Sequence, residues 1–305
     1  MILGSPWFEG HAALVGKLRR EMSLRVALLV YDIVPLRRPE WCDPSLVGQF
    51  TAWMTAILPL ADVLLTISRA TSGELERFAA ASHTMLLASP VRIPVGTGFT
   101  SGVAANENQA TDAREPPRAG SYVLVVATIE IRKNHTLLFR VWRRLLDELA
   151  ADAVPTLVFA GKVGWLVEDL MAQLDNTACL GGKIMLLQEP TDAELRALYG
   201  GCLFTVFPSL YEGWGLPVTE SLAQGCPCVI SNAMSLPEAG GSLARYFDPE
   251  NTGEAYAAIR DTIMDADGLA AWRDRIAREF KPVGWDESAR AIVEAIGVVA
   301  IGRDA

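Results

Sequence analysis

From residue 121 onward, short apolar and β-prone runs alternate with helical segments, and this alternation constrains the fold more than any other feature. Strand patterns occur at 121–129, 155–161, 183–189, 203–209 and 227–231, and a helical pattern follows each of them. Parallel strands need a crossover of a dozen or more residues, which a helix supplies. The alternation predicts an α/β, doubly wound parallel sheet with a ligand site at the carboxyl ends of its strands.

The first part of the chain shows a shorter α/β alternation, with strand patterns at 25–34, 61–68 and 83–88. Residues 102–120 are poor in large apolar side chains and predict a linker. We therefore expect two Rossmann-like domains, a partial one with its linker at 1–117 and a second at 118–283. Residues 284–305 predict an amphipathic helix and a tail, and the helix could pack on either domain.

Composition excludes several classes of partner. The net charge of −9 argues against nucleic acid, because phosphate contacts with a polynucleotide need a basic surface. Five cysteines without disulfide or zinc spacing predict reduced core residues, and no apolar run reaches the roughly 18 residues of a membrane span. A cytoplasmic location is the default expectation. The segment 11–22 predicts either a packed helix or a basic helix in peripheral contact with an anionic membrane.

Two glutamates, Glu212 and Glu220, flank the segment Gly213, Trp214, Gly215, Leu216 in "YEGWGLPVTE". Glu212 follows a predicted buried strand, and Pro217 suits the first turn of a helix that would hold Glu220 in that turn. Glycines let a backbone approach a ligand, and the free amides of a helix start favour an anion. This order of carboxylate, anion site and carboxylate suits a nucleotide sugar, which has hydroxyls on both sides of a diphosphate. The alternative is that Glu220 only complements the helix dipole.

Basic residues stand at other predicted strand ends. Arg132 and Lys133 follow the strand at 121–129 and can meet a diphosphate, although such a pair can also be a solvated surface pair. Asn134 is placed to cap the next helix. Lys162 follows the strand at 155–161 and is either a further ligand or a turn lysine.

Several segments together resemble the donor domain of the retaining glycosyltransferase family 4, which has the GT-B fold. They are "VATIEIRKNH", "AGKVGWLVEDL", "PTDAELRALYGGC", "FPSLYEGWGLPVTESLAQGCPCVIS" and "SLPEAGG". "YDIVPLRRPEWC" and "ADVLLTISRATSGEL" resemble parts of that family's acceptor domain, so the resemblance spans residues 26–295. It implies transfer of a hexose, with mannose and a GDP-sugar weakly preferred, from a nucleoside diphosphate sugar to a glycan or lipid-linked acceptor. It also implies that the donor is a substrate and that no cofactor or metal is needed.

The resemblance assigns roles to the residues already singled out. Glu212 would contact the donor sugar, Glu220 the ribose, and Arg132 with Lys133 the diphosphate. The amides of Gly213 to Leu216 would hold sugar and phosphate, the turn at Leu187 would meet the base, and Glu238 would support the site. Many members of the family have a basic residue where Thr128 stands here, which leaves the phosphate site to Arg132 and Lys133.

The N-terminal part departs from the family pattern. Only about 25 residues precede "RVALLVYDIV", where members usually have roughly a hundred, so we expect an incomplete first domain. We expect either that the chain begins from a truncated reading frame or that a partner or oligomer completes this domain, and that the chain alone transfers sugar poorly or not at all. Tyr31 stands where many members have histidine, so Tyr31 and Asp32 are weak acceptor-side candidates.

Three other functions are alternatives to glycosyl transfer. A dinucleotide oxidoreductase would show G-x-G-x-x-G after an early strand, and no such motif occurs. A sugar-nucleotide epimerase and a weakly active or inactive donor-binding protein stay open. A metal site at Asp265 and Asp267 is not expected, since both lie beside a predicted helix far from the strand ends.

Overall fold

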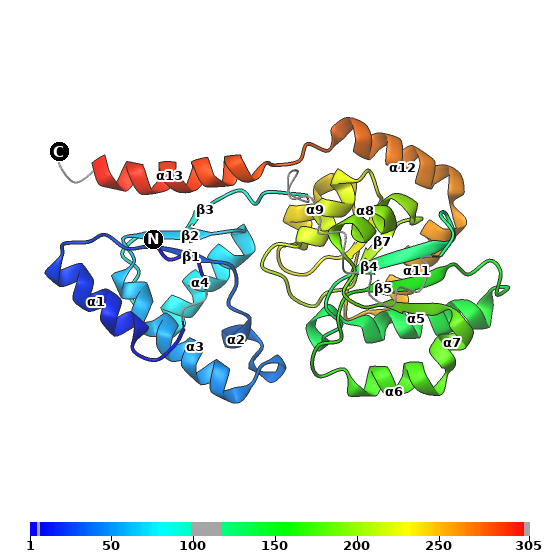
Figure 1. Ribbon diagram of the computed structural model, residues 1–305, viewed down its shortest axis with the longest axis horizontal. Helices are drawn as coiled ribbons and strands as arrows, with labels where there is room; N and C mark the ends of the chain where they lie inside the picture. The colour runs from blue at the N-terminus through cyan, green and yellow to red at the C-terminus, as the bar shows by residue number, and fades with distance from the viewer. Residues whose placement is uncertain (5–6, 99–116, 302–305) are drawn as a thin grey trace. The chain divides into compact units, whose positions relative to one another are not determined.

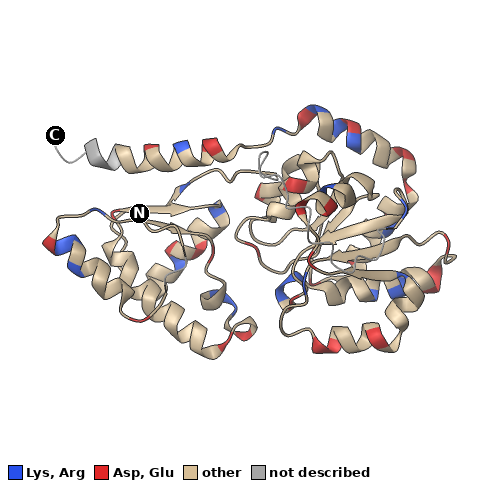
Figure 2. Ribbon diagram, viewed as in Figure 1, with Lys and Arg blue, Asp and Glu red and all other residues tan. Residues whose placement is uncertain are grey.

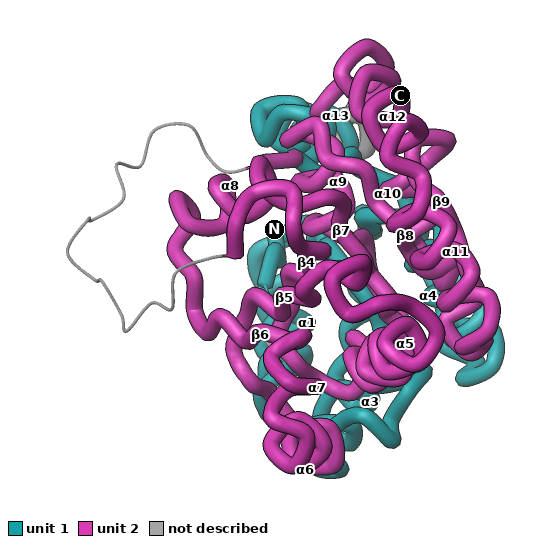
Figure 3. The backbone as a smooth tube through the Cα atoms, turned by 90° about the vertical axis from the view of Figure 1, so that its right-hand side faces the viewer, with its two compact units in different colours: residues 1–96, 283–305 teal, residues 97–282 magenta. Residues whose placement is uncertain are grey.

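The computed structural model describes residues 1–4, 7–98 and 117–301 (Figure 1). The chain divides into two compact units, residues 1–96 with 283–305 and residues 97–282 (Figure 3). The first unit thus ends at Gly96 and includes the C-terminal helix, whereas the sequence suggested a boundary after residue 117 and a separate C-terminal segment. Most of the expected linker, residues 102–116, lies outside the described residues.

The first unit contains a parallel sheet with the strand order β1-β2-β3. The strands are β1 Ala27–Val30, β2 Val63–Thr66 and β3 Val91–Arg92, and the helices are α1 His11–Glu21, α2 Val34–Arg37, α3 Pro44–Ile57, α4 Arg69–Ala81 and α13 Trp285–Ile301. The predicted strands at 25–34 and 61–68 are confirmed, and the one at 83–88 is wrong. Met85 and Leu87 in that run are exposed, so it lacks the burial that would stabilise an inner strand, and β3 forms further along.

Both faces of this sheet are covered. Leu28 and Leu64 face a core with α3 and α4, whereas Leu29 and Leu65 face the opposite way. The second face is covered by α13, whose contact residues, spaced along one helical stripe, are Ala291, Ile292, Ala295 and Ile296. The amphipathic helix predicted at the C-terminus is therefore confirmed, and it packs on the first unit.

The second unit contains a six-stranded parallel sheet in the order β6-β5-β4-β7-β8-β9. The strands are β4 Tyr122–Val126, β5 Thr156–Ala160, β6 Ile184–Leu187, β7 Thr205–Phe207, β8 Cys228–Ser231 and β9 Arg245–Phe247. The helices are α5 His135–Glu148, α6 Glu168–Asn176, α7 Ala178–Gly182, α8 Asp192–Gly201, α9 Leu216–Ala223, α10 Leu236–Gly240, α11 Thr252–Met264 and α12 Ala266–Glu279. The five strands predicted here are confirmed, and the three-residue β9 was missed.

The strand order places a topological switch point between β4 and β7. The chain builds the sheet from β4 toward β6, returns to the other side of β4 with β7, and continues to β9. Alternate residues of β4 face opposite layers: Val123 and Val125 pack in the core with α5, and Tyr122 and Leu124 pack with α8. In such sheets, ligands bind where the carboxyl ends of the strands diverge at the switch point.

Acidic and basic residues are interspersed along the chain in both units (Figure 2). Within the described ranges, no helix combines the length and apolar character needed to cross a membrane.

Candidate functional site

The turns that follow β4 and β7 lie next to each other because these strands are neighbours in the sheet. Arg132 and Lys133 belong to the short 3-10 turn η3 (Ile131–Lys133) after β4, and Glu212 lies in the loop after β7. The Leu210 amide donates a 2.9 Å hydrogen bond to the Arg132 carbonyl and joins the two turns. Three residues singled out in the sequence are thus brought together at the switch point.

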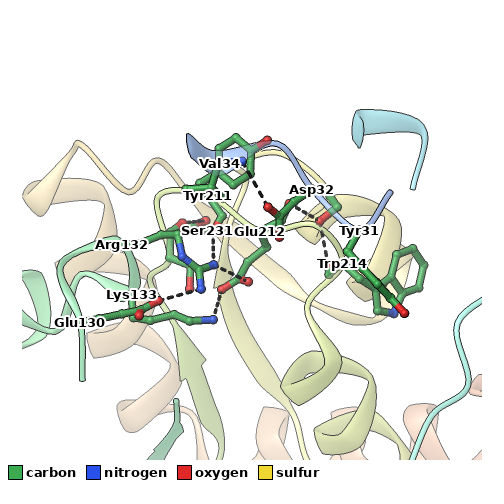
Figure 4. Close-up of polar contacts among 12 residues, drawn as sticks. Tyr31, Asp32, Val34, Glu130, Arg132, Lys133, Tyr211, Glu212, Trp214 and Ser231 are labelled. Carbon is green, nitrogen blue, oxygen red and sulfur yellow. Dashed lines mark hydrogen bonds and ion pairs between the residues drawn. The ribbon is translucent and has the colours of Figure 1, made fainter. Parts of the chain in front are cut away.

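Four charged side chains form one ion-pair cluster at this point (Figure 4). Lys133 Nζ lies 2.5 Å from Glu212 Oε1, and Arg132 Nη1 lies 2.9 Å from Glu212 Oε2. Arg132 Nη2 also lies 2.7 Å from Glu130 Oε1. The cluster contains two cations and two carboxylates, so it is close to neutral in this ligand-free arrangement. Sequence reasoning missed Glu130, whose one signal was its place two residues before Arg132.

Glu212 is held in its ionised form. Burial alone would raise the pKa of this carboxyl, but the charges and hydrogen bonds of Lys133 and Arg132 outweigh burial and bring the pKa below its ordinary value. An ionised carboxylate only accepts hydrogen bonds. Glu212 can therefore bind hydroxyl donors near neutral pH while it orients the two cations.

Asn134 has a different role from the one predicted. It occupies the N-cap position of α5, but its backbone is left-handed and its side chain makes no capping bond. Its Nδ2 instead donates to the carbonyls of Pro208, at 3.3 Å, and Pro249, at 3.1 Å. The predicted cap is wrong because the left-handed backbone of Asn134 departs from the extended conformation of a capping residue, and the side chain is oriented by its Nδ2 bonds. Asn134 thereby ties the turn after β4 to the loop after β7.

The glycine-rich loop leads directly into α9. Gly215 precedes the helix with φ of 110°, a region that side chains with a Cβ rarely adopt. A Cβ on Gly215 would also lie 2.7 Å from Leu236 Cδ2. Both the backbone conformation and the close approach of α10 therefore require glycine here. Leu216 begins α9 and is exposed.

Glu220 is anchored from α8. It lies just after the first turn of α9, one residue beyond the predicted position, because the helix starts at Leu216. The hydroxyl of the buried Tyr199 donates a 3.1 Å hydrogen bond to Glu220 Oε2. Burial raises the pKa of Glu220, the Tyr199 bond opposes that rise, and the charge of Asp192 adds to it. The carboxylate is therefore fixed by a tyrosine and keeps a second oxygen for another donor.

The weaker candidates lie at neighbouring strand ends. The Lys162 carbonyl accepts a 2.8 Å bond from the Ile129 amide just after β5, and the Lys162 side chain is exposed. Leu187 ends β6, where its carbonyl accepts a 2.9 Å bond from Gly161. Thr128 lies between β4 and η3, and its methyl group packs against Gly164. Thr128 and Lys162 follow strands of the same sheet, Leu187 ends one, and Glu238 lies half-buried in α10.

Tyr31 and Asp32 belong to the first unit and follow β1. The Tyr31 hydroxyl donates a 2.6 Å hydrogen bond to the Leu3 carbonyl. Asp32 Oδ1 accepts a 3.2 Å bond from the Val34 amide, a turn arrangement that precedes α2. Both side chains therefore stabilise their own unit.

Helix α1 has the packing of an ordinary surface helix. Ala12 and Gly16 are buried, and His11 Nδ1 accepts a 3.0 Å bond from Trp53 Nε1 in α3. Arg19 forms a 2.7 Å ion pair with Asp62, whose pKa is thereby lowered against the opposing effect of burial. These contacts support the packed helix that was the first of the two sequence interpretations.

The sequence of the chain matches a known family over the part that holds this cluster. Residues 108–278, more than half of the chain, match the family described as glycosyl transferases group 1. The chain belongs to this family. It is 25% identical over 279 residues to the serotype-specific mannosyltransferase WbdA of Escherichia coli, a match that covers 89% of this chain and 33% of WbdA. It is 31% identical over 178 residues to the O-antigen chain mannosyltransferase B of Escherichia coli, covering 57% of this chain and 45% of that protein. The chain thus spans about a third of the length of the WbdA proteins it matches.

Solved structures identify the fold. An UDP-forming α,α-trehalose-phosphate synthase from Burkholderia xenovorans superposes with a TM-score of 0.68 at 14% identity, covering 95% of this chain and 72% of that one. HepE of Anabaena, crystallised with UDP-glucose, superposes with a TM-score of 0.66 at 14% identity, covering 94% of this chain and 76% of that one. The predicted GT-B fold with Rossmann-like domains is confirmed.

Proposed function

We propose that this glycosyl transferases group 1 member is a retaining hexosyltransferase that moves mannose from a nucleoside diphosphate sugar to a glycan or lipid-linked acceptor in polysaccharide assembly. The observation that carries the proposal is the cluster of Arg132, Lys133 and Glu212 at the switch point of a parallel sheet. Mannose is supported by the relatives, since WbdA and O-antigen chain mannosyltransferase B are both mannosyltransferases. A GDP-sugar remains our preferred donor.

Arg132 and Lys133 would bind the diphosphate. Their ion pairs with Glu212 already fix both side chains, so little side-chain entropy would be lost when they bind phosphate oxygens. Two cations beside two carboxylates have no net charge to attract a dianion strongly, whereas they can still donate directed hydrogen bonds to it. Glu212 would then also accept hydrogen bonds from the donor sugar, and Glu220 from the ribose.

The chemistry would follow from this placement. The leaving diphosphate oxygen would accept the proton of the acceptor hydroxyl on the face from which it departs. A new C–O bond would form at the anomeric carbon on that same face as the sugar–phosphate bond breaks, which retains configuration. Arg132 and Lys133 would stabilise the charge that develops on the diphosphate, which makes positioning and electrostatics the main contributions and a metal unnecessary.

A panel of nucleotide sugars tests the proposal. Calorimetric titration of the whole chain with GDP-mannose, UDP-glucose and UDP-N-acetylglucosamine should show saturable binding, strongest for GDP-mannose. Failure of every donor to bind would refute the proposal. Conversion of a bound donor to another nucleotide sugar without an acceptor would instead identify an epimerase.

A further inference from the structure

Ser235 stands at the first boundary of α10, between β8 and the short helix, and is completely buried. A serine at the N-cap of a helix ordinarily accepts a hydrogen bond from an amide in the first turn. The Ser235 side chain makes no such bond. The Ser235 hydroxyl therefore does not cap α10, although its position at the start of the helix suggests that role.

The hydroxyl instead reaches the glycine-rich loop. Ser235 Oγ lies 2.8 Å from the carbonyl oxygen of Glu212 and 2.9 Å from that of Trp214. A hydroxyl has one proton, so it donates to both carbonyls in a shared bond. These contacts join residues more than twenty positions apart in the sequence.

The directions of these two carbonyls fix the orientation of the Glu212–Gly213 and Trp214–Gly215 peptide groups. In a trans peptide, the carbonyl and the following N–H point in opposite directions. When the carbonyls of Glu212 and Trp214 point to Ser235, the N–H groups of Gly213 and Gly215 point away from it. Each of these peptide groups is followed by a glycine, which can adopt many backbone conformations. The orientation of the peptide groups therefore depends on the hydrogen bonds from Ser235 to the two carbonyls.

Other side chains hold the rest of the loop in the same way. Ser231 Oγ donates to the Ser209 carbonyl at 2.6 Å, and Arg132 Nη1 donates to the Tyr211 carbonyl at 2.8 Å. Side chains from β8, from η3 and from the turn before α10 therefore hold four carbonyls of the loop. Ser235 holds the part that contains the two glycines and Glu212.

We propose that Ser235 is a positioning residue of the sugar-transfer site, which fixes the Gly213 and Gly215 amides and the Glu212 backbone in the orientation that the donor requires. This inference rests on the proposed function. Ser235 itself does not touch the donor. It acts through the two peptide groups, so its loss should affect the transfer step more than the binding of a nucleoside diphosphate that lacks the sugar.

The test uses S235A and S235T in the full chain, with N251A as a matched control. Asn251 caps α11 by accepting bonds of 3.1 Å from the amides of Gly253 and Glu254, so N251A removes a true helix cap elsewhere in the same unit. With the best donor of the panel, kcat of S235A should fall about 100-fold, the loss expected when reacting groups are misplaced by about 1 Å. The Kd of the nucleoside diphosphate alone should change by a much smaller factor, because Arg132 and Lys133 would hold the diphosphate. S235T should restore most of kcat because it keeps the hydroxyl, and N251A should lower Tm but not kcat.

Three results would overturn the inference: unchanged kcat in S235A, an equal loss of affinity for the nucleoside diphosphate alone, or an equal loss of kcat in N251A. If S235A unfolds at the assay temperature, S235C replaces it, since a thiol has similar size but is a weak donor. A parent chain that binds no nucleotide sugar would refute the proposed function itself. An active parent with a fully active S235A would refute only the role of Ser235.

Discussion

His135 should make the stability of this protein strongly dependent on pH. It is the first residue of α5, is almost completely buried, and packs edge-on against Phe159 with ring centroids 4.7 Å apart. Neither ring nitrogen has a hydrogen-bond partner within the described part of the chain. Burial, followed by the nearby charge of Lys133, lowers the pKa of His135 from 6.5 to about 3. The folded protein therefore keeps a neutral imidazole at a pH where the unfolded chain takes up a proton.

The size of the effect follows from this difference in pKa. Because the folded pKa lies below the unfolded one, stability is fully present above pH 6.5 and falls as the pH drops toward 3. Between pH 8 and pH 5, proton uptake by the unfolded chain should lower the free energy of unfolding by about 2 kcal/mol. His135→Leu removes this linkage together with two unpaired buried nitrogens.

Urea unfolding of the parent and H135L at pH 8, 6.5 and 5 measures the linkage. H135L should be at least as stable as the parent at pH 8, and its advantage should grow by about 2 kcal/mol at pH 5. H83N, which removes an exposed imidazole, should keep the pH dependence of the parent. If the parent and H135L lose stability in parallel as the pH falls, the reasoning about His135 is refuted.

Three further changes test the site. Glu220→Ala should weaken donor binding by roughly 1–3 kcal/mol in calorimetry, because donor hydroxyls and Tyr199 lose an acceptor; unchanged affinity would remove Glu220 from the site. Gly215→Ala should lower the free energy of unfolding by about 1–3 kcal/mol in denaturant titration, given its φ of 110° and the approach of Leu236; a variant as stable as the parent would contradict the geometry. Glu212→Ala should destabilise the ligand-free protein by about 1.5–3 kcal/mol, since the half-buried Lys133 loses its carboxylate and Arg132 keeps only Glu130; no change in Tm would mean that the cluster is not maintained in solution.

The sequence predicts the second sheet well because the pattern of each strand is local. Runs such as 121–129 and 203–209 are mostly apolar, as is typical of strands buried on both faces, and the helices between them require parallel pairing. Their carboxyl ends then carry Arg132 and Glu212 to one edge. The run at 83–88 is also apolar, but Met85 and Leu87 stay exposed and Leu86 is only partly buried against the first core. This difference does not appear in a local pattern.

Partners chosen over long sequence distances could not be predicted. Asn134 looks like a helix cap, yet its amide bonds to the carbonyls of Pro208 and Pro249, which become available only when the sheet has formed. Ser235 shows the same exchange of a local bond for distant ones. The sequence predicted Arg132 and Lys133 as ligands of a phosphate, but it did not show that both form ion pairs with carboxylates in the folded protein.

The central claim is that Lys133 and Arg132 bind the diphosphate of the donor, and a comparison of two ligands in the parent and one variant tests it most directly. Calorimetry would compare the nucleoside diphosphate of the best donor with its monophosphate, in the parent and in Lys133→Gln, which leaves Glu212 paired with Arg132. The parent should bind the diphosphate about 10–100-fold more tightly, the effect of hydrogen bonds to a charged group, and most of this preference should be lost in K133Q. An equal preference for the diphosphate in both proteins would contradict the account.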